Sequence, residues 1–187
     1  MPHIPPVDPD RLTAAQQAVH DRIAGGERGA VRGPFRVLLH SPRAADVVQE
    51  AGRYLRFHSA LPERVRELAI TVVARHWHAD YEWAAHAPKA EQAGVPRQVL
   101  DAVAAGAEPD FAESADRIAY TYVTAVLSSS GLAPVPEPVL AAARDAFGIN
   151  GLVDLTVLTG YYTMLAMVLN TFEVRPEPDV APWRGAG

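Results

Sequence analysis

The chain has 187 residues and a mass of 20.1 kDa, which favours a single domain with room for a sizeable core. Its 17 Lys and Arg stand against 22 Asp and Glu, and the formal charge of −5 argues against nucleic acid or an anionic membrane as a partner. Cysteine is absent, which excludes disulfides, thiolate metal ligands and Cys nucleophiles and leaves His, carboxylates and hydroxyls for any chemistry.

Both ends of the chain are rich in proline, which is typical of extended segments. We expect residues 1–12 to form an extended N-terminal arm and residues 174–187 a Pro-rich tail, on one domain that spans 1–187. The first residues, MPHIPPVDPDRL, contain no apolar segment of the kind that secretory signals carry, so a cytoplasmic location is expected.

Between these ends the apolar residues recur with helical spacing, and period-2 alternation is nearly absent, which predicts an all-α domain. Thr13 is a good N-cap for the first helix, and Gly94 followed by Pro96 predicts the end of another. The expected helices cover residues 13–24, 34–40, 43–58, 62–76, 78–93, 96–104, 112–128, 137–147 and 150–172.

Two of these helices are unusually apolar. The helix at 62–76 is apolar on most sides after Glu67, which predicts a place at the centre of the domain. The last helix carries no charge from Leu155 to Phe172 and is about as long as the shortest membrane spans. Its threonines, tyrosines and Asn170 favour a buried core or subunit-interface helix over a span.

The densest group of polar side chains, RHWHADYEWAAH at 75–86, follows the expected central helix. Glu82 and His86 lie four residues apart and share a helix face, with about 5 to 6 Å between their β-carbons. A carboxylate beside an imidazole is suited to general acid–base catalysis. If Glu67 also reaches this face, the two carboxylates would compete to ionise, and one would stay protonated near neutral pH.

Two other interpretations of the same residues stay open. The first is an exposed contact with a structural role only, worth a few tenths of a kcal/mol. The second is a metal site, because His78, Glu82 and His86 follow one another at four-residue steps. That stripe lacks the HExxH order and spreads over about 80°, so we assign no metal ligand.

The stretch RELAITVVARHWHADYEWAAHAPKAEQAGVPRQVL, with GPFRVLLHSP before it and GYYTMLAMVLNTFEV after it, resembles the carboxymuconolactone decarboxylase family of the alkyl hydroperoxidase D-like superfamily. The resemblance extends over roughly residues 30–174. It implies an alkyl hydroperoxidase D-like helical bundle that assembles as a homo-oligomer, often a trimer or hexamer, with its site near the start of the motif helix.

In the peroxidase branch of that superfamily, the motif is a glutamate, then CxxC, then a histidine. On this chain the glutamate matches Glu67, the two cysteine positions fall on Ala79 and Glu82, and the histidine matches His86. Both thiols are absent, so thiol peroxidase activity is not expected. The decarboxylase branch carries a glutamate and a histidine at the positions of Glu82 and His86, and this chain resembles that branch.

The resemblance implies a carboxy-lyase of the 4-carboxymuconolactone decarboxylase type, which uses no cofactor and acts on a small unsaturated carboxylic acid or lactone. His86 would be the acid–base group, Glu82 its partner and Glu67 the second carboxyl. The residues expected to contact the small-molecule substrate are Tyr81, Arg75, Tyr161 and His78, with Arg53 as a further candidate cation.

Two alternatives remain beside decarboxylation. The same His and Glu pair would serve a proton-transfer isomerase, a dehydratase or a cyclase on the same scaffold. The chain would also fit a non-catalytic helical oligomer that binds a small ligand. The sequence names neither the substrate nor the number of subunits.

Overall fold

The computed structural model describes residues 4–129, 132–176 and 183, and in these residues all regular secondary structure is helical, which confirms the all-α fold class. A 3-10 turn at Pro9–Arg11 precedes eight α-helices in the described part of the chain. Their bounds are α1 Ala14–Gly25, α2 Pro34–Leu38, α3 Pro42–Phe57, α4 Glu63–His76, α5 Asp80–Gln92, α6 Arg97–Ala105, α7 Ser114–Ser128 and α8 Glu137–Thr171.

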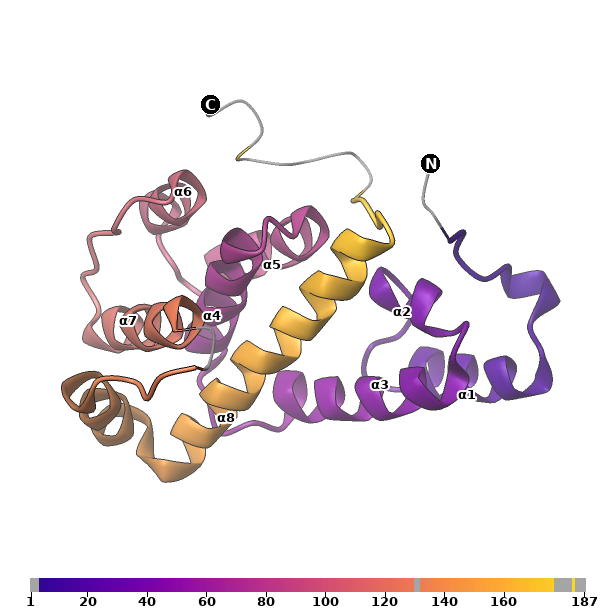
Figure 1. Cartoon of the computed structure of the whole chain (residues 1–187), viewed down its shortest axis with the longest axis horizontal. Helices are drawn as coiled ribbons and strands as arrows, with labels where there is room; N and C mark the ends of the chain where they lie inside the picture. Colours follow the sequence, from indigo (N-terminus) through magenta and orange to yellow (C-terminus); the bar gives the residue numbers. More distant parts are fainter. Residues whose placement is uncertain (1–3, 130–131, 177–182, 184–187) are drawn as a thin grey trace.

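The long helix α8 divides the molecule into two groups of helices (Figure 1). On one side α4, α5, α6 and α7 pack around the main core, and on the other side α1, α2 and α3 pack together. The second group has a smaller core of its own, made of Val19, Ile23, Phe35, Leu39 and Ala45. Both α2 and α3 also contact α8, so α8 has helices of both groups against it.

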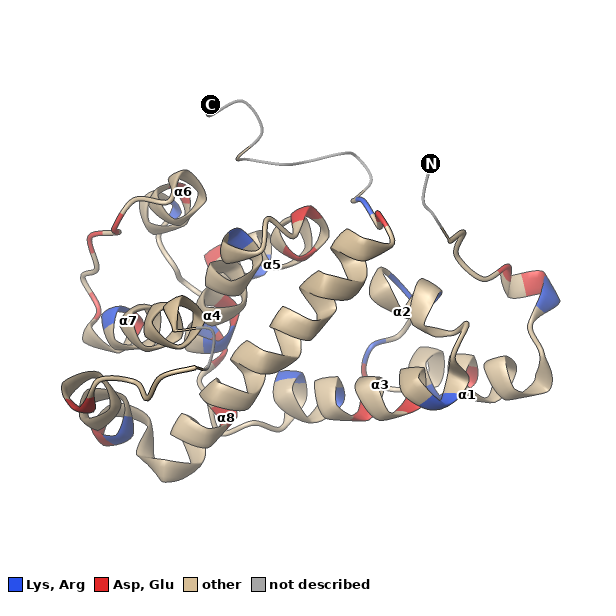
Figure 2. Cartoon of the chain, viewed as in Figure 1, with Lys and Arg blue, Asp and Glu red and all other residues tan. Residues whose placement is uncertain are grey.

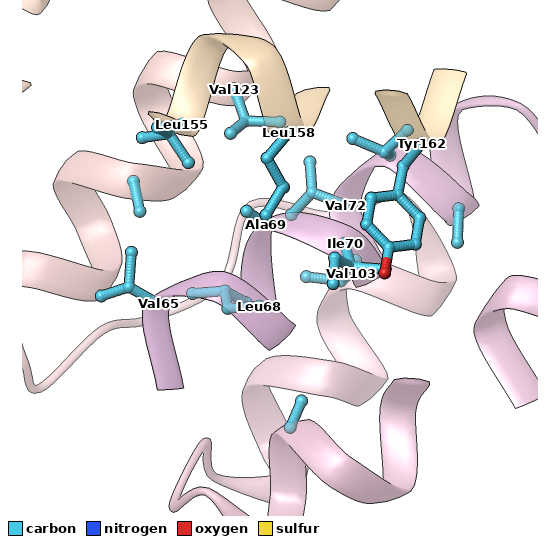
Figure 3. Close-up of a cluster of buried hydrophobic side chains, with 14 of the residues drawn as sticks. Val65, Leu68, Ala69, Ile70, Val72, Val103, Val123, Leu155, Leu158 and Tyr162 are labelled. Atoms are coloured by element: carbon cyan, nitrogen blue, oxygen red, sulfur yellow. The ribbon is translucent and has the colours of Figure 1, made fainter. Parts of the chain in front are cut away.

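The centre of the main core is α4, as its apolar sequence predicts. Every residue from Glu67 to Ala74 is buried, and α4 packs against α5, α6, α7 and α8. In Figure 3, Leu158 points toward Ala69 of α4. A helix that is apolar on nearly all sides needs such neighbours on nearly all sides, and a buried carboxylate in its middle needs a polar partner.

Local signals in the sequence explain several boundaries. Thr13 and Gln16 form the reciprocal hydrogen bonds of a capping box at the start of α1. Gly106 ends α6 in the left-handed conformation, with φ 70°. Gly148, with φ 68°, interrupts α8, so α8 contains the two helices that the sequence predicts at 137–147 and 150–172.

Two expectations need correction. The expected extended arm at 1–12 contains the 3-10 turn Pro9–Arg11, because the Asp8 side chain accepts a hydrogen bond from the Asp10 backbone N–H at 3.0 Å. The helix expected from residue 78 begins at Asp80, because His78 has φ 49°, outside the helical region. Residues 1–3 and most of the expected tail at 174–187 lie outside the described residues.

Among the described residues, α8 alone is long and apolar enough to cross a bilayer by length and composition, with a mean hydropathy of 1.6. Half of that apolar window is buried inside the chain, and core helices of soluble proteins pass the same test, so this is weak evidence for a span. Figure 2 shows few charged residues along the second part of α8.

Candidate active site

The candidate site lies where α4 and α5 pack together beside α8. Glu67 comes from the middle of α4, Glu82 and His86 from α5, and Tyr162 from α8. The exposed fractions of Glu67, Glu82 and His86 are 2%, 4% and 4%, so three ionisable side chains are buried together. Burial of this kind is costly unless the groups satisfy one another.

They do so by forming a row of three with the imidazole in the middle. The Nδ1 atom of His86 lies 2.6 Å from Oε2 of Glu67, and its Nε2 atom lies 3.3 Å from Oε2 of Glu82. The edge of the His86 ring also meets the Tyr162 ring, with 5.2 Å between centroids and 83° between planes. The structure therefore brings together the three residues that the sequence singles out.

The row favours the protonated form of the imidazole. Burial works against the charge on His86, but hydrogen bonds to Glu67 and Glu82 and the charges of both carboxylates outweigh it, so the pKa of His86 is raised. Burial likewise opposes ionisation of Glu67, but His86 and the nearby Lys89 and Arg66 leave the pKa of Glu67 lowered. The expectation of a protonated carboxyl near neutral pH is thus wrong for Glu67.

A cavity of about 300 Å³, which we call the site cavity, lies against this row. His86 and Glu82 line it, whereas Glu67 does not. Glu67 is therefore on the side of the ring away from the lining residues, and Nε2 is the ring nitrogen on the side of Glu82, which lines the cavity. This geometry makes Glu67 a positioning residue and His86 and Glu82 the groups that can meet a bound molecule.

Four cationic side chains also line the site cavity: Arg28, Arg32, Arg56 and Lys89. They gather there in a chain whose net charge is −5. The Nε and Nη2 atoms of Arg28 are buried and have no hydrogen-bond partner. Burial, and then the charge of Arg56, lower the pKa of Lys89. Buried donors and repelling cations of this kind are suited to an anionic ligand.

Three tyrosines complete the wall of the site cavity, and all are held neutral. Burial raises the pKa of Tyr161 to about 12, and burial also raises the pKa values of Tyr162 and Tyr81. The Tyr161 hydroxyl donates to the Val48 carbonyl at 3.0 Å. Tyr81 and Tyr161, both expected to contact substrate, thus lie in the cavity wall.

The other residues expected to contact substrate lie outside the site cavity. Arg75 donates to the Ala104 carbonyl at 2.7 Å and lies 2.6 Å from Nε2 of the exposed His78. Arg53 is half-exposed among Glu50, Glu27 and His58. None of the three lines the site cavity.

The cations of the site cavity are what sequence reasoning missed. Lys89 had a signal, because it follows Glu82 and His86 at positions i+7 and i+3 and so shares their helix face. Arg28 and Arg32 precede α2 in a segment without periodicity, and only the packing of that segment against α5 and α8 brings them to the cavity.

The alternative of a metal stripe is not supported by the geometry. His78 bonds Arg75 and lies before α5, so it does not align with Glu82 and His86. In the described part of the chain no three His, Cys, Asp or Glu side chains form a metal-binding group. What the site offers is a proton donor held by two carboxylates, facing a cavity with cations and neutral hydroxyls.

The comparisons with known proteins agree with this architecture. A sequence model of the carboxymuconolactone decarboxylase family matches residues 42–125, which include Glu67, Glu82 and His86. A solved structure of an uncharacterized peroxidase-related protein from Silicibacter sp. TM1040 is similar, with 18% identity and a TM-score of 0.72 over 98% of this chain and 93% of that one. At this identity the likeness shows the fold alone. No curated protein matches the chain.

Proposed function

We propose that the chain, whose residues 42–125 match the carboxymuconolactone decarboxylase family and which has the alkyl hydroperoxidase D-like fold, is a carboxy-lyase. Its substrate would be a small unsaturated carboxylic acid or lactone, and His86 and Glu82 would supply acid–base catalysis without a cofactor. The observation that carries the proposal is the placement of His86, fixed between two carboxylates, beside a cavity lined by four cations.

In this proposal, the four cations of the site cavity bind the substrate. Arg28 and Arg56 carry planar guanidinium groups suited to paired hydrogen bonds with a carboxylate, and Lys89 adds a point charge. A substrate carboxylate or carbonyl oxygen in the site cavity would satisfy the buried donors of Arg28. The same charges would stabilise the negative charge that develops when the substrate loses carbon dioxide.

The reaction then has two steps. The bond between the substrate carboxylate and its neighbouring carbon breaks, carbon dioxide leaves, and the bonding electron pair is delocalised into the conjugated carbonyl as an enolate. The protonated His86 then donates its Nε2 proton to carbon, directly or through Glu82, and the neutral ring recovers a proton from water. Glu67 holds Nδ1 and stabilises the ring in its charged form before each turnover.

The test is the release of carbon dioxide from carboxymuconolactone by the wild type, by His86→Gln and by His76→Gln. His76 is an exposed histidine of α4 that does not line the site cavity, so it serves as the matched control. Loss of a general acid lowers kcat by roughly 10²–10⁴-fold, and we expect this only for His86→Gln. Equal turnover in all three proteins would remove His86 from the mechanism, and tight binding of the lactone without turnover would contradict catalysis.

A second candidate is a proton-transfer isomerase, dehydratase or cyclase. It is favoured by the presence of Glu82, a carboxylate, next to His86 in the wall of the same cavity, since an acid and a base side by side can move a proton between two substrate atoms. Incorporation of deuterium from solvent into an unsaturated acid, without release of carbon dioxide, would support this candidate over the lyase.

We also propose that the chain forms a homo-oligomer, a trimer or a hexamer. Support comes from the second part of α8, where exposed apolar residues follow one helix face: Ile149, Val153, Val157 and Met167. A continuous apolar stripe on a soluble protein is typical of an interaction surface.

A further inference from the structure

A second cavity of about 710 Å³, which we call the outer cavity, adjoins the site cavity. It lies between the N-terminal arm, α2, the first half of α5 and residues 173–176. The arm is held in place there, because the Val7 N–H donates to the Arg36 carbonyl at 3.0 Å and His40 Nε2 lies 2.8 Å from the Pro5 carbonyl. Figure 1 shows α2 beside the end of α8, and residues 173–176, which follow α8, line this cavity.

The two cavities share part of their walls. Arg32, Tyr81 and Ala85 line both, so these side chains stand at the boundary between them. Tyr81 is held close to the backbone of Gly33, where any Cβ would overlap its ring, and Gly33 has φ 54°, a conformation that favours glycine. The close approach fixes the tyrosine ring at the boundary.

The two cavities differ in chemistry. The site cavity holds four cations, one carboxylate and three hydroxyls. Much of the outer cavity is lined by aliphatic side chains, among them Val7, Val31, Val37 and Leu39. Its three arginines, Arg32, Arg36 and Arg175, are solvent-exposed, and Arg175 forms an ion pair with Asp80 at 2.7 Å. His20 and Glu173 also line the outer cavity. One end of the combined space thus gathers cations beside His86, and the other is mainly aliphatic, with charged side chains that reach solvent.

We propose that one amphipathic carboxylic acid occupies both cavities, with its carboxylate among the cations of the site cavity and its apolar body past Tyr81 in the outer cavity. The proposal rests on the proposed function in one respect, namely that the site cavity takes the acid end of the substrate. The outer cavity lies within the range of roughly 300–1,000 Å³ typical of pockets for drug-sized ligands, so it has room for such a body. The substrate class is therefore an unsaturated acid with an apolar chain or ring attached.

The test uses saturated straight-chain carboxylates from butyrate to decanoate, titrated calorimetrically into the whole protein. These probes have no conjugated carbonyl and do not react, so binding is measured apart from catalysis. Each methylene buried in the outer cavity should tighten binding about fourfold, from the transfer free energy of about 0.8 kcal/mol per buried CH₂. We expect Kd to fall steadily with chain length in the wild type.

Three variants locate the two ends of the probe. Ala84 is half-buried and lines only the outer cavity, so Ala84→Leu should remove the dependence of Kd on chain length. Ala142 is exposed on α8 and lines neither cavity, so Kd should still depend on chain length in Ala142→Leu. Lys89→Met should weaken every probe by a similar factor, because Lys89 lines only the site cavity.

A Kd that does not change with chain length in the wild type would overturn the proposal, and so would a dependence that survives in Ala84→Leu. If Ala84→Leu does not fold, Val31→Ser tests the same wall, since Val31 is half-buried in the outer cavity. The proposed function can fail separately: chain-length-dependent binding by a protein that releases no carbon dioxide supports the two-cavity site and rejects the lyase.

Discussion

The imidazole of His86 lies 2.6 Å from the carboxylate of Glu67, a residue nineteen positions earlier in the chain and on a different helix. The site is therefore more than an i,i+4 pair on one helix surface. The buried contact with Glu67 occupies Nδ1 of His86, the ring nitrogen that does not face Glu82. A ring bonded at both nitrogens to carboxylates is held in one orientation and favours the charged form.

Glu67→Gln tests this relationship through the pH dependence of catalysis. The glutamine side chain can still accept from Nδ1, but without the negative charge the pKa of His86 should fall. Activity that needs protonated His86 should then be lost at lower pH than in the wild type, so the alkaline limb of the kcat profile moves toward neutral pH, and kcat itself should fall roughly 10²-fold or more. Nitrogen-15 NMR of the imidazole follows the same titration directly.

The matched control is Glu63→Gln, which removes an exposed carboxylate from the first turn of α4. It should leave both the kcat profile and the NMR titration of His86 unchanged. If the two variants behave alike, Glu67 does not hold His86 in its charged form.

The same pair makes stability depend on pH. The raised pKa of His86 means that its contribution is complete below the unfolded value of 6.5 and is lost as pH rises through the folded pKa. The lowered pKa of Glu67 means that its contribution is complete above the unfolded value of 4.5 and is lost as pH falls through the folded pKa. The free energy of unfolding of the wild type should therefore exceed that of Glu67→Gln most between about pH 4.5 and 6.5. Urea melts at pH 3, 5.5 and 9 measure this, and a difference independent of pH would contradict it.

Most of the fold follows from local signals in the sequence. The apolar run of α4 predicts its central place, Thr13 predicts the start of α1, and a break near Gly148 separates the two parts of α8. The N-terminal arm is different, because a hydrogen bond from Asp10 to Asp8 and the contact of Val7 with α2 fold part of a segment whose prolines favour an extended chain.

Only half of the candidate site was predictable in the same way. Glu82 and His86 share a helix face at a fixed spacing, so their pairing follows from the helix itself. Arg75 lies only seven residues before Glu82, yet it belongs to α4, and its guanidinium donates to the Ala104 carbonyl. Arg28 reaches the cavity only through tertiary packing, which no spacing rule describes.

The buried ion pair between Arg64 and Asp116 offers a prediction about stability alone. Arg64 Nη2 lies 2.6 Å from Asp116 Oδ2, with side-chain exposures of 29% and 2%. Asp116→Ala leaves a partly buried arginine without its partner and should destabilise the protein by about 3 kcal/mol in urea melts. Asp101→Ala breaks the exposed pair with Arg97 and should cost less than about 1 kcal/mol. Similar losses in both variants would contradict the assignment.

The proposed oligomer predicts a change in mass on substitution in the apolar stripe of α8. Val157 is 50% exposed, and a glutamate there would bury a charge in any interface that the stripe forms. Val157→Glu should therefore give monomers in size-exclusion chromatography with light scattering, at an unchanged Tm of the subunit. Leu132→Glu, at a residue 91% exposed outside α8, should keep the assembly of the wild type. A monomeric wild type, or an assembly that tolerates Val157→Glu, would contradict the proposal.

Gly52 of α3 lies against two residues of the site cavity, so a single methyl group there should alter substrate binding. A Cβ at Gly52 would overlap the Tyr161 hydroxyl and the Arg28 guanidinium. Gly52→Ala must displace one or both, at a cost of about 1–3 kcal/mol, and we expect KM for the lactone to rise roughly tenfold with a smaller change in kcat. Gly25→Ala is the control, because a Cβ at this position meets nothing within 4 Å. A KM for Gly52→Ala equal to that of the control would show that neither side chain contacts the substrate.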